Sequence, residues 1–104
     1  MQLYVINWSF QNNEDQLFAT NEFCQYLNDG KLKENIDGFE LKCIAHIPQN
    51  GSGVIICKAS DISILFRIFN MWRKNFNISF EFKPALTNEE LASTHIENSF
   101  WVKN

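Results

Sequence analysis

Hydrophobic and polar residues alternate along four segments of the chain, and two longer segments between them repeat hydrophobic residues at intervals of three and four. Alternation with a period of two is typical of β-strands, and the three-four spacing is typical of amphipathic helices. The alternation predicts strands over residues 2–10, 39–47, 54–59 and 77–83. The three-four spacing predicts helices over residues 14–28 and 61–76. The predicted order is therefore strand, helix, strand, strand, helix, strand.

Capping residues lie at the predicted boundaries of these elements. Ser60 is a good N-cap for the second helix, and Gly30 can end the first helix in the left-handed conformation. Thr87 and Glu90 have the spacing of a capping box, which predicts a third, shorter helix running toward residue 95. Pro84 removes a backbone donor and is expected to close the fourth strand, as at a sheet edge.

The order of the elements predicts an α+β ferredoxin-like fold, βαββαβ, as a single domain over residues 1–104. Right-handed crossovers would place two helices on one face of a four-stranded antiparallel sheet with strand order 4-1-3-2. The short third helix would follow at the C-terminal end. In the central hairpin we expect Cys43 opposite Cys57, Ala45 opposite Ile55 and Ile44 opposite Ile56.

The alternation also predicts which side chains the helices cover. We expect the covered face to hold Leu3, Val5, Phe39, Leu41, Cys43, Ile55, Cys57, Ile78, Phe80 and Phe82. The first helix would pack on this face through Leu17, Phe18, Phe23, Cys24 and Leu27, and the second through Ile62, Leu65, Phe69, Trp72 and Phe76. The open face would show Tyr4, Ile6, Trp8, Ile44, His46, Val54 and Ile56. Monomeric proteins rarely expose an apolar surface of that size to water, so we expect another group to pack over it as a cover.

A second copy of the chain is the cover that we expect, because two such sheets packed face to face bury both apolar surfaces. The dimer-interface candidates are Ile6, Ile44, Val54 and Ile56. A host protein, a small apolar ligand or the C-terminal pair Phe100-Trp101 are the alternative covers. The favoured hypothesis is thus a homodimeric, non-catalytic module that binds a ligand or a protein.

The alternative hypothesis is a small enzyme, or a binder of haem or another small molecule, that uses a pocket beside the open face. Its ligand-binding candidates are Tyr4, Trp8 and His46. The imidazole of His46 has the chemistry of a general base or a haem ligand. A lone histidine on an edge strand is more often a structural residue. The acidic residue considered as a partner for His46, Glu81, would lie three strand spacings from it, about 14 Å. We therefore predict no catalytic residue and no cofactor.

Metal binding is not expected. Cys43 and His46 are three residues apart on a strand, so their side chains would point to opposite faces. Cys43 and Cys57 are expected to be small buried side chains. The three cysteines form no CxxC motif, which is typical of reduced thiols in a reducing compartment.

RNA is a further candidate for the open face, because Leu3-Tyr4-Val5-Ile6-Asn7-Trp8 resembles the first-strand motif of RNA-recognition-motif domains. The third strand lacks the second motif, with Ser52, Val54 and Cys57 where those domains have aromatic residues. The formal charge of -3 provides no general attraction for nucleic acid. These features disfavour nucleic acid as a partner.

Composition narrows the class of protein further. Hydrophobic residues make up 45% of the chain and aromatic residues 14%, which is typical of a globular domain. There is no run of about 18 apolar residues, and the first residues lack the features of a signal peptide. We expect a cytoplasmic protein with no membrane association.

Nearly the whole chain resembles a family of short, uncharacterised cyanobacterial and cyanophage proteins, a domain of unknown function in the dimeric α+β barrel superfamily. The matching pieces are Leu3 to Trp8, Gly38 to Leu41, Ala45 to Pro48, Gly51 to Val54, the helix with Trp72, and Pro84 to Glu90. The resemblance implies the fold and a dimer, and it implies no reaction. Lys58 differs from the family, in which an acidic residue is usual at this position.

Overall fold

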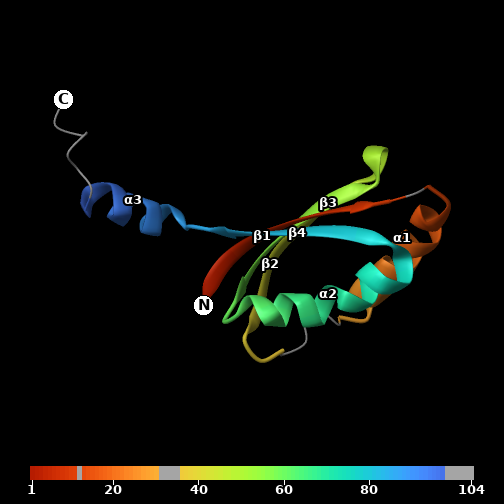
Figure 1. Cartoon of the computed structure of the whole chain (residues 1–104), viewed down its shortest axis with the longest axis horizontal. Coiled ribbons are helices and arrows are strands. Elements are labelled where there is room, and N and C mark those ends of the chain that lie inside the picture. The colour runs from red at the N-terminus through yellow and green to blue at the C-terminus, as the bar shows by residue number, and fades with distance from the viewer. Residues whose placement is uncertain (12, 31–35, 98–104) are drawn as a thin grey trace.

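The computed structural model describes residues 1–11, 13–30 and 36–97. Its elements are β1 (Gln2–Phe10), α1 (Asn13–Asn28), β2 (Phe39–Ile47), a 3-10 turn (Pro48–Asn50), β3 (Ser52–Ala59), α2 (Ile62–Phe76), β4 (Ile78–Ala85) and α3 (Asn88–Glu97). The sheet order is β2-β3-β1-β4, with antiparallel neighbours, which is the predicted 4-1-3-2 order read from the other edge. The ferredoxin-like βαββαβ fold is confirmed, with α1 and α2 on the same side of the sheet (Figure 1).

Two helices begin at side-chain caps. Asp61 caps α2 by accepting a hydrogen bond from the backbone N–H of Ser63 at 2.9 Å, so the cap lies one residue beyond the predicted Ser60. At α3 the predicted capping box is confirmed: the Glu90 N–H donates to the Thr87 hydroxyl at 3.1 Å, and the Thr87 N–H donates to the Glu90 carboxylate at 2.9 Å. These bonds satisfy backbone donors that have no partner within the helix.

The assignment of β1 to the two faces of the sheet is the main correction to the sequence analysis. Tyr4, Ile6 and Trp8 lie beneath the helices, with exposed fractions of 8%, 0% and 7%. Leu3 and Val5 share the open face with Asn7 and Ser9, and all four are half-buried. The larger side chains bury more apolar surface under the helices, whereas the set containing asparagine and serine keeps contact with water. Ile6 therefore has no surface to offer to a partner chain.

A β-bulge corrects the prediction for β2. The register shifts between Leu41 and Cys43, so that Cys43 pairs with Ile56, Ile44 with Ile55 and Ala45 with Val54. The extra residue reverses the alternation from that point on. Ile44 and His46 therefore lie on the helix side, and Cys43, predicted to be buried, is exposed on the open face.

The buried stripe of α2 is confirmed at Leu65, Phe69 and Trp72, although Ile62 at its start is exposed. The stripe of α1 differs from the prediction. Ala19 and Phe23 are buried and Tyr26 packs against the core, while Leu17 and Phe18 have exposed fractions of 72% and 61%. Cys24 is exposed, and the side chain of Leu27 lies outside the described part of the chain. Because the side chain of Ala19 is small, α1 can lie close to the sheet. The helix therefore packs through Ala19, Phe23 and Tyr26.

The open face of the sheet has an aliphatic centre with charged and polar margins. The register places Leu3, Val5, Cys43, Ala45, Ile47, Val54 and Ile56 on this face. A shallow hollow of ≈270 Å³ near one end is lined by open-face residues that include Asn7, Ser9, Ile47 and Val54. In Figure 1, α3 extends away from the sheet beyond the end of β4 and leaves this face uncovered. Phe100-Trp101, the predicted alternative cover, lies outside the described residues.

No helix within residues 1–11, 13–30 and 36–97 is long and apolar enough to cross a membrane.

Candidate functional site

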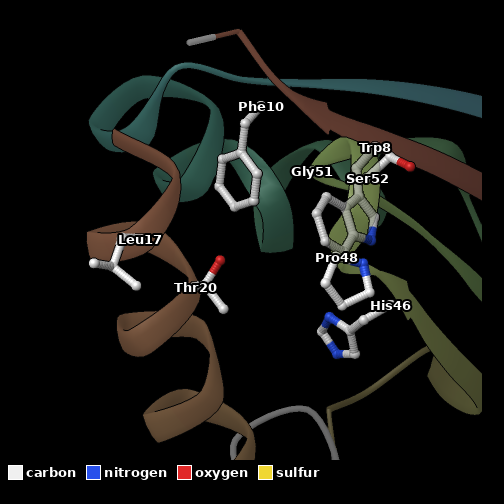
Figure 2. Close-up of a pocket in the computed structure, with 8 residues that line it drawn as sticks. All are labelled: Trp8, Phe10, Leu17, Thr20, His46, Pro48, Gly51 and Ser52. Atoms are coloured by element: carbon white, nitrogen blue, oxygen red, sulfur yellow. The ribbon is translucent and has the colours of Figure 1, made fainter. Parts of the chain in front are cut away.

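A cavity of ≈290 Å³ lies between α1 and the end of the sheet where β2 and β3 turn. Helix α1 lines it with Leu17 and Thr20, and β1 lines it with Trp8 and Phe10. The β2–β3 hairpin contributes His46, Pro48, Gly51 and Ser52. Figure 2 shows the Trp8 and His46 rings on the sheet side of this space, with Leu17 and Thr20 across from them on α1.

The hairpin turn is held in place by backbone hydrogen bonds. Pro48 starts a short 3-10 turn, and Gly51 ends it in the left-handed conformation with φ 64°. The Gly51 N–H donates to the Pro48 carbonyl at 3.3 Å, and the Gly51 carbonyl accepts from the Phe10 N–H at 2.9 Å. A glycine adopts this φ without steric cost. The turn thus fixes the cavity wall against the end of β1.

Gly53 determines where the Trp8 ring lies. The two residues are paired across β3 and β1, and a Cβ atom on Gly53 would lie 2.3 Å from the Trp8 Cζ2 atom and 2.6 Å from the Ala45 carbonyl oxygen. These distances are far shorter than van der Waals contact. The indole therefore lies directly over the Gly53 backbone, and space remains between the indole and α1.

Trp8 and His46 lie next to each other on the helix side of the sheet, whereas the sequence analysis placed both on the open face. Their ring centroids are 5.6 Å apart in an edge-to-face arrangement, and the His46 ring also lies 5.7 Å from that of Phe23. His46 stays exposed, whereas Trp8 is buried. Tyr4, the third predicted ligand-binding residue, does not line the cavity. It lies farther along β1, opposite Cys57 and Pro84.

The indole nitrogen of Trp8 is a buried donor without a hydrogen-bond partner among the described residues. Leaving such a donor unpaired costs roughly 1–3 kcal/mol. The ring is nevertheless kept in position by its contacts with Phe10 and Phe23, at centroid distances of 5.5 and 6.1 Å. Packing therefore outweighs the lost hydrogen bond at Trp8.

Most of the described residues that line the cavity are apolar or aromatic. The polar side chains among them are His46, Thr20 and Ser52, and no carboxylate, lysine or arginine is among these described lining residues. Glu81 lies on the opposite face of the sheet and on the far edge strand from His46. Within the described residues, no group of three or more His, Cys, Asp or Glu side chains is placed to hold a metal ion.

Several wall residues were not predicted from the sequence. Phe10 was assigned to the strand alone, and Leu17 was expected to be buried. Thr20, Pro48 and Ser52 carry no pattern that points to a site. The glycine-marked turn around Gly51 and Gly53 was a usable signal, because glycines beside a strand often allow a close approach of another group.

Comparison with known proteins adds a family match. Residues 2–98 match the model of a protein family described as a domain of unknown function, DUF3303. No curated protein and no solved structure matches the chain.

Proposed function

The chain belongs to the DUF3303 family, and we propose that it is a non-catalytic binding protein that pairs with a second copy of itself through the open sheet face. The observation that carries this proposal is the aliphatic centre of that face, formed by Val5, Val54, Ile56 and their neighbours. A sheet in a small domain normally packs on both faces or has one polar face. Within the described part of the chain no element covers this face, and its centre is not polar.

A second copy fits the face because its charges are balanced at both edges. On the β2 side Lys42 and Glu40 form an ion pair at 2.8 Å, which lowers the pKa of the Glu40 carboxyl. On the β4 side Lys83 and Glu81 form an ion pair at 3.2 Å. A two-fold axis parallel to the strands would place one edge over the other, with an acid and a base on each side. Such a pairing would bury the aliphatic centres and place acidic and basic side chains of the two edges opposite each other.

RNA is a poorer fit to the same face. Base stacking needs exposed aromatic rings, and the aromatic residues of the strand that resembles the RNA-binding motif, Tyr4 and Trp8, are buried beneath the helices. The open-face positions of β1 and β3 are aliphatic or polar instead. These properties favour contact with protein over contact with nucleic acid.

We expect Ile56→Glu to turn a dimer into a folded monomer. The side chain lies at the centre of the open face, and a carboxylate there would lose its hydration on pairing and repel its symmetry mate. Sedimentation velocity at tens of micromolar, with circular dichroism to verify the fold, measures the effect. Met71→Glu is the matched control, because Met71 is an exposed apolar residue of α2 on the other side of the molecule. A monomeric wild-type chain, or equal effects of the two variants, would sink the proposal.

A small-molecule site is the second candidate function, favoured by the cavity that brings Trp8 and His46 together. With a volume of ≈290 Å³ it lies just below the usual range for ligand pockets, about 300–1,000 Å³. It is too small to enclose a haem, and this disfavours the haem-ligand role for His46.

A further inference from the structure

We propose that the cavity between α1 and the β2–β3 hairpin binds a small, uncharged, planar aromatic molecule carrying one hydrogen-bonding group. This inference deepens the small-molecule function proposed above. It is independent of the proposed dimer, because the cavity lies on the helix side of the sheet and the dimer would form on the other face.

The size of the cavity sets the size of the ligand. A water molecule takes about 30 Å³ of liquid volume, so a space of ≈290 Å³ holds a molecule of one or two fused rings. The space is partly open to solvent at α1, where Leu17 stands with 72% of its surface exposed. A ligand can therefore enter without any change in the fold.

The walls favour an aromatic molecule. Trp8 and Phe10 meet edge to face, with an angle of 80° between the ring planes, and Trp8 and His46 meet at 71°. Rings set nearly at right angles offer both faces and edges to a planar guest, which are the two preferred modes of aromatic contact. Leu17 and Pro48 add aliphatic surface.

The polar groups favour an uncharged molecule with one polar substituent. Thr20 and His46 provide a hydroxyl and an imidazole group that can donate and accept hydrogen bonds. The Ser52 hydroxyl donates to the Asn50 side chain and can therefore only accept from a ligand. An ionic ligand would be partly desolvated there, and none of the described residues that line the space is a carboxylate, lysine or arginine that could pair with it. A phenol-like hydroxyl or a carbonyl satisfies these groups without that cost.

Small residues at two positions of the chain keep this space open. Gly53 allows the indole of Trp8 to lie flat on the strand, where any side chain at residue 53 would displace it toward α1. Thr20 is a small residue at a helix position that faces the sheet, where a larger apolar residue would fill the gap. Because Gly53 and Thr20 are small, the aromatic wall of the cavity faces open space instead of another side chain.

The test is a titration of the full chain with 2-naphthol, followed by isothermal calorimetry and by the NMR signals of the indole N–H groups. We expect saturable binding that shifts the indole N–H signal of Trp8, assigned with Trp8→Phe. Leu17→Trp fills the cavity mouth and is expected to weaken binding by at least about tenfold, the effect of a blocked apolar pocket. Phe18→Trp is the matched control, since Phe18 is also exposed on α1 and contacts Phe76 instead of the cavity.

The outcomes separate this proposal from the dimer. Binding that persists in the Ile56→Glu variant supports a site independent of the open face. No saturation by 2-naphthol up to millimolar concentration, or equal losses in Leu17→Trp and Phe18→Trp, overturns the site. Equal binding of cyclooctanol, an alcohol of similar size without an aromatic ring, or of ionised 2-naphthoate overturns the ligand class.

Discussion

Replacing Ile6 with aspartate is expected to abolish folding, whereas replacing the adjacent Val5 with aspartate leaves a folded chain. Ile6 has no exposed surface and lies between Ile55 and Phe82 in the sheet. Loss of a buried isoleucine side chain alone costs roughly 2–5 kcal/mol, and an unpaired buried carboxylate adds to that cost. The total approaches the whole stability of a small domain, about 5–15 kcal/mol.

Val5→Asp is the matched control because Val5 lies on the open face, paired with Ile56 and with Lys83. In the single chain the new carboxylate has water and an ammonium group near it, so we expect the folded monomer to lose about 1 kcal/mol from the lower β-propensity of aspartate. A charge on this face also opposes the proposed pairing of two chains, so the two variants are compared at a concentration at which the wild type is monomeric. Far-UV circular dichroism and urea unfolding of both variants measure the difference. A folded Ile6→Asp beside an unfolded Val5→Asp would mean that the faces of β1 are reversed.

Gly53→Ala is expected to lower the free energy of unfolding by about 1–3 kcal/mol, as overpacking of a core does. The added methyl group would lie 2.3 Å from the Trp8 Cζ2 atom and 2.6 Å from the Ala45 carbonyl oxygen. The indole is buried and the carbonyl belongs to the neighbouring strand, so neither moves freely. For a domain of this size the midpoint of thermal unfolding should fall by roughly 4–8 °C per kcal/mol.

A double-mutant cycle with Trp8→Phe shows whether the indole causes this loss. Phenylalanine lacks the Cζ2 atom, so Gly53→Ala should cost less in the Trp8→Phe background than in the wild type. Relief should be partial, because the contact with the Ala45 carbonyl oxygen persists. Additive effects of the two substitutions would contradict the packing described for residues 8 and 53.

The order of the elements was predictable because each strand and helix leaves a local periodic pattern. The capping box at Thr87 and Glu90 and the stripe on α2 were likewise readable, since both depend on residues within two turns of one helix. It was harder to predict which residues lie on which face of the sheet. In β1 both alternating sets contain apolar residues, and Asn7 and Ser9 were the signal that the set of Leu3 and Val5 faces water.

The β2 bulge could not be predicted, because inserting one residue leaves the period-two pattern intact on either side of Leu41 and Cys43. That single shift moved His46 to the helix side, where it meets Trp8. Trp8 and His46 thus lie together on the helix side of the sheet and not on the open face where both were expected. The residues contributed by α1, such as Thr20, depend on how the helix docks, which the sequence does not encode locally.

The three cysteines provide the most direct test of the claim that a second copy covers the open face. Cys43 is exposed on that face and Cys24 is exposed on α1, so Cys24 is an internal control. Cys57 is buried, and burial raises the pKa of its thiol to about 11, so that little reactive thiolate forms at pH 8. The measurement is the rate of iodoacetamide labelling at each cysteine, followed by mass spectrometry, as the protein concentration is raised from nanomolar to hundreds of micromolar. We predict that labelling of Cys43 slows as the dimer forms while labelling of Cys24 keeps its rate and Cys57 stays unmodified. Constant rates at both Cys43 and Cys24 across the whole range would contradict the account.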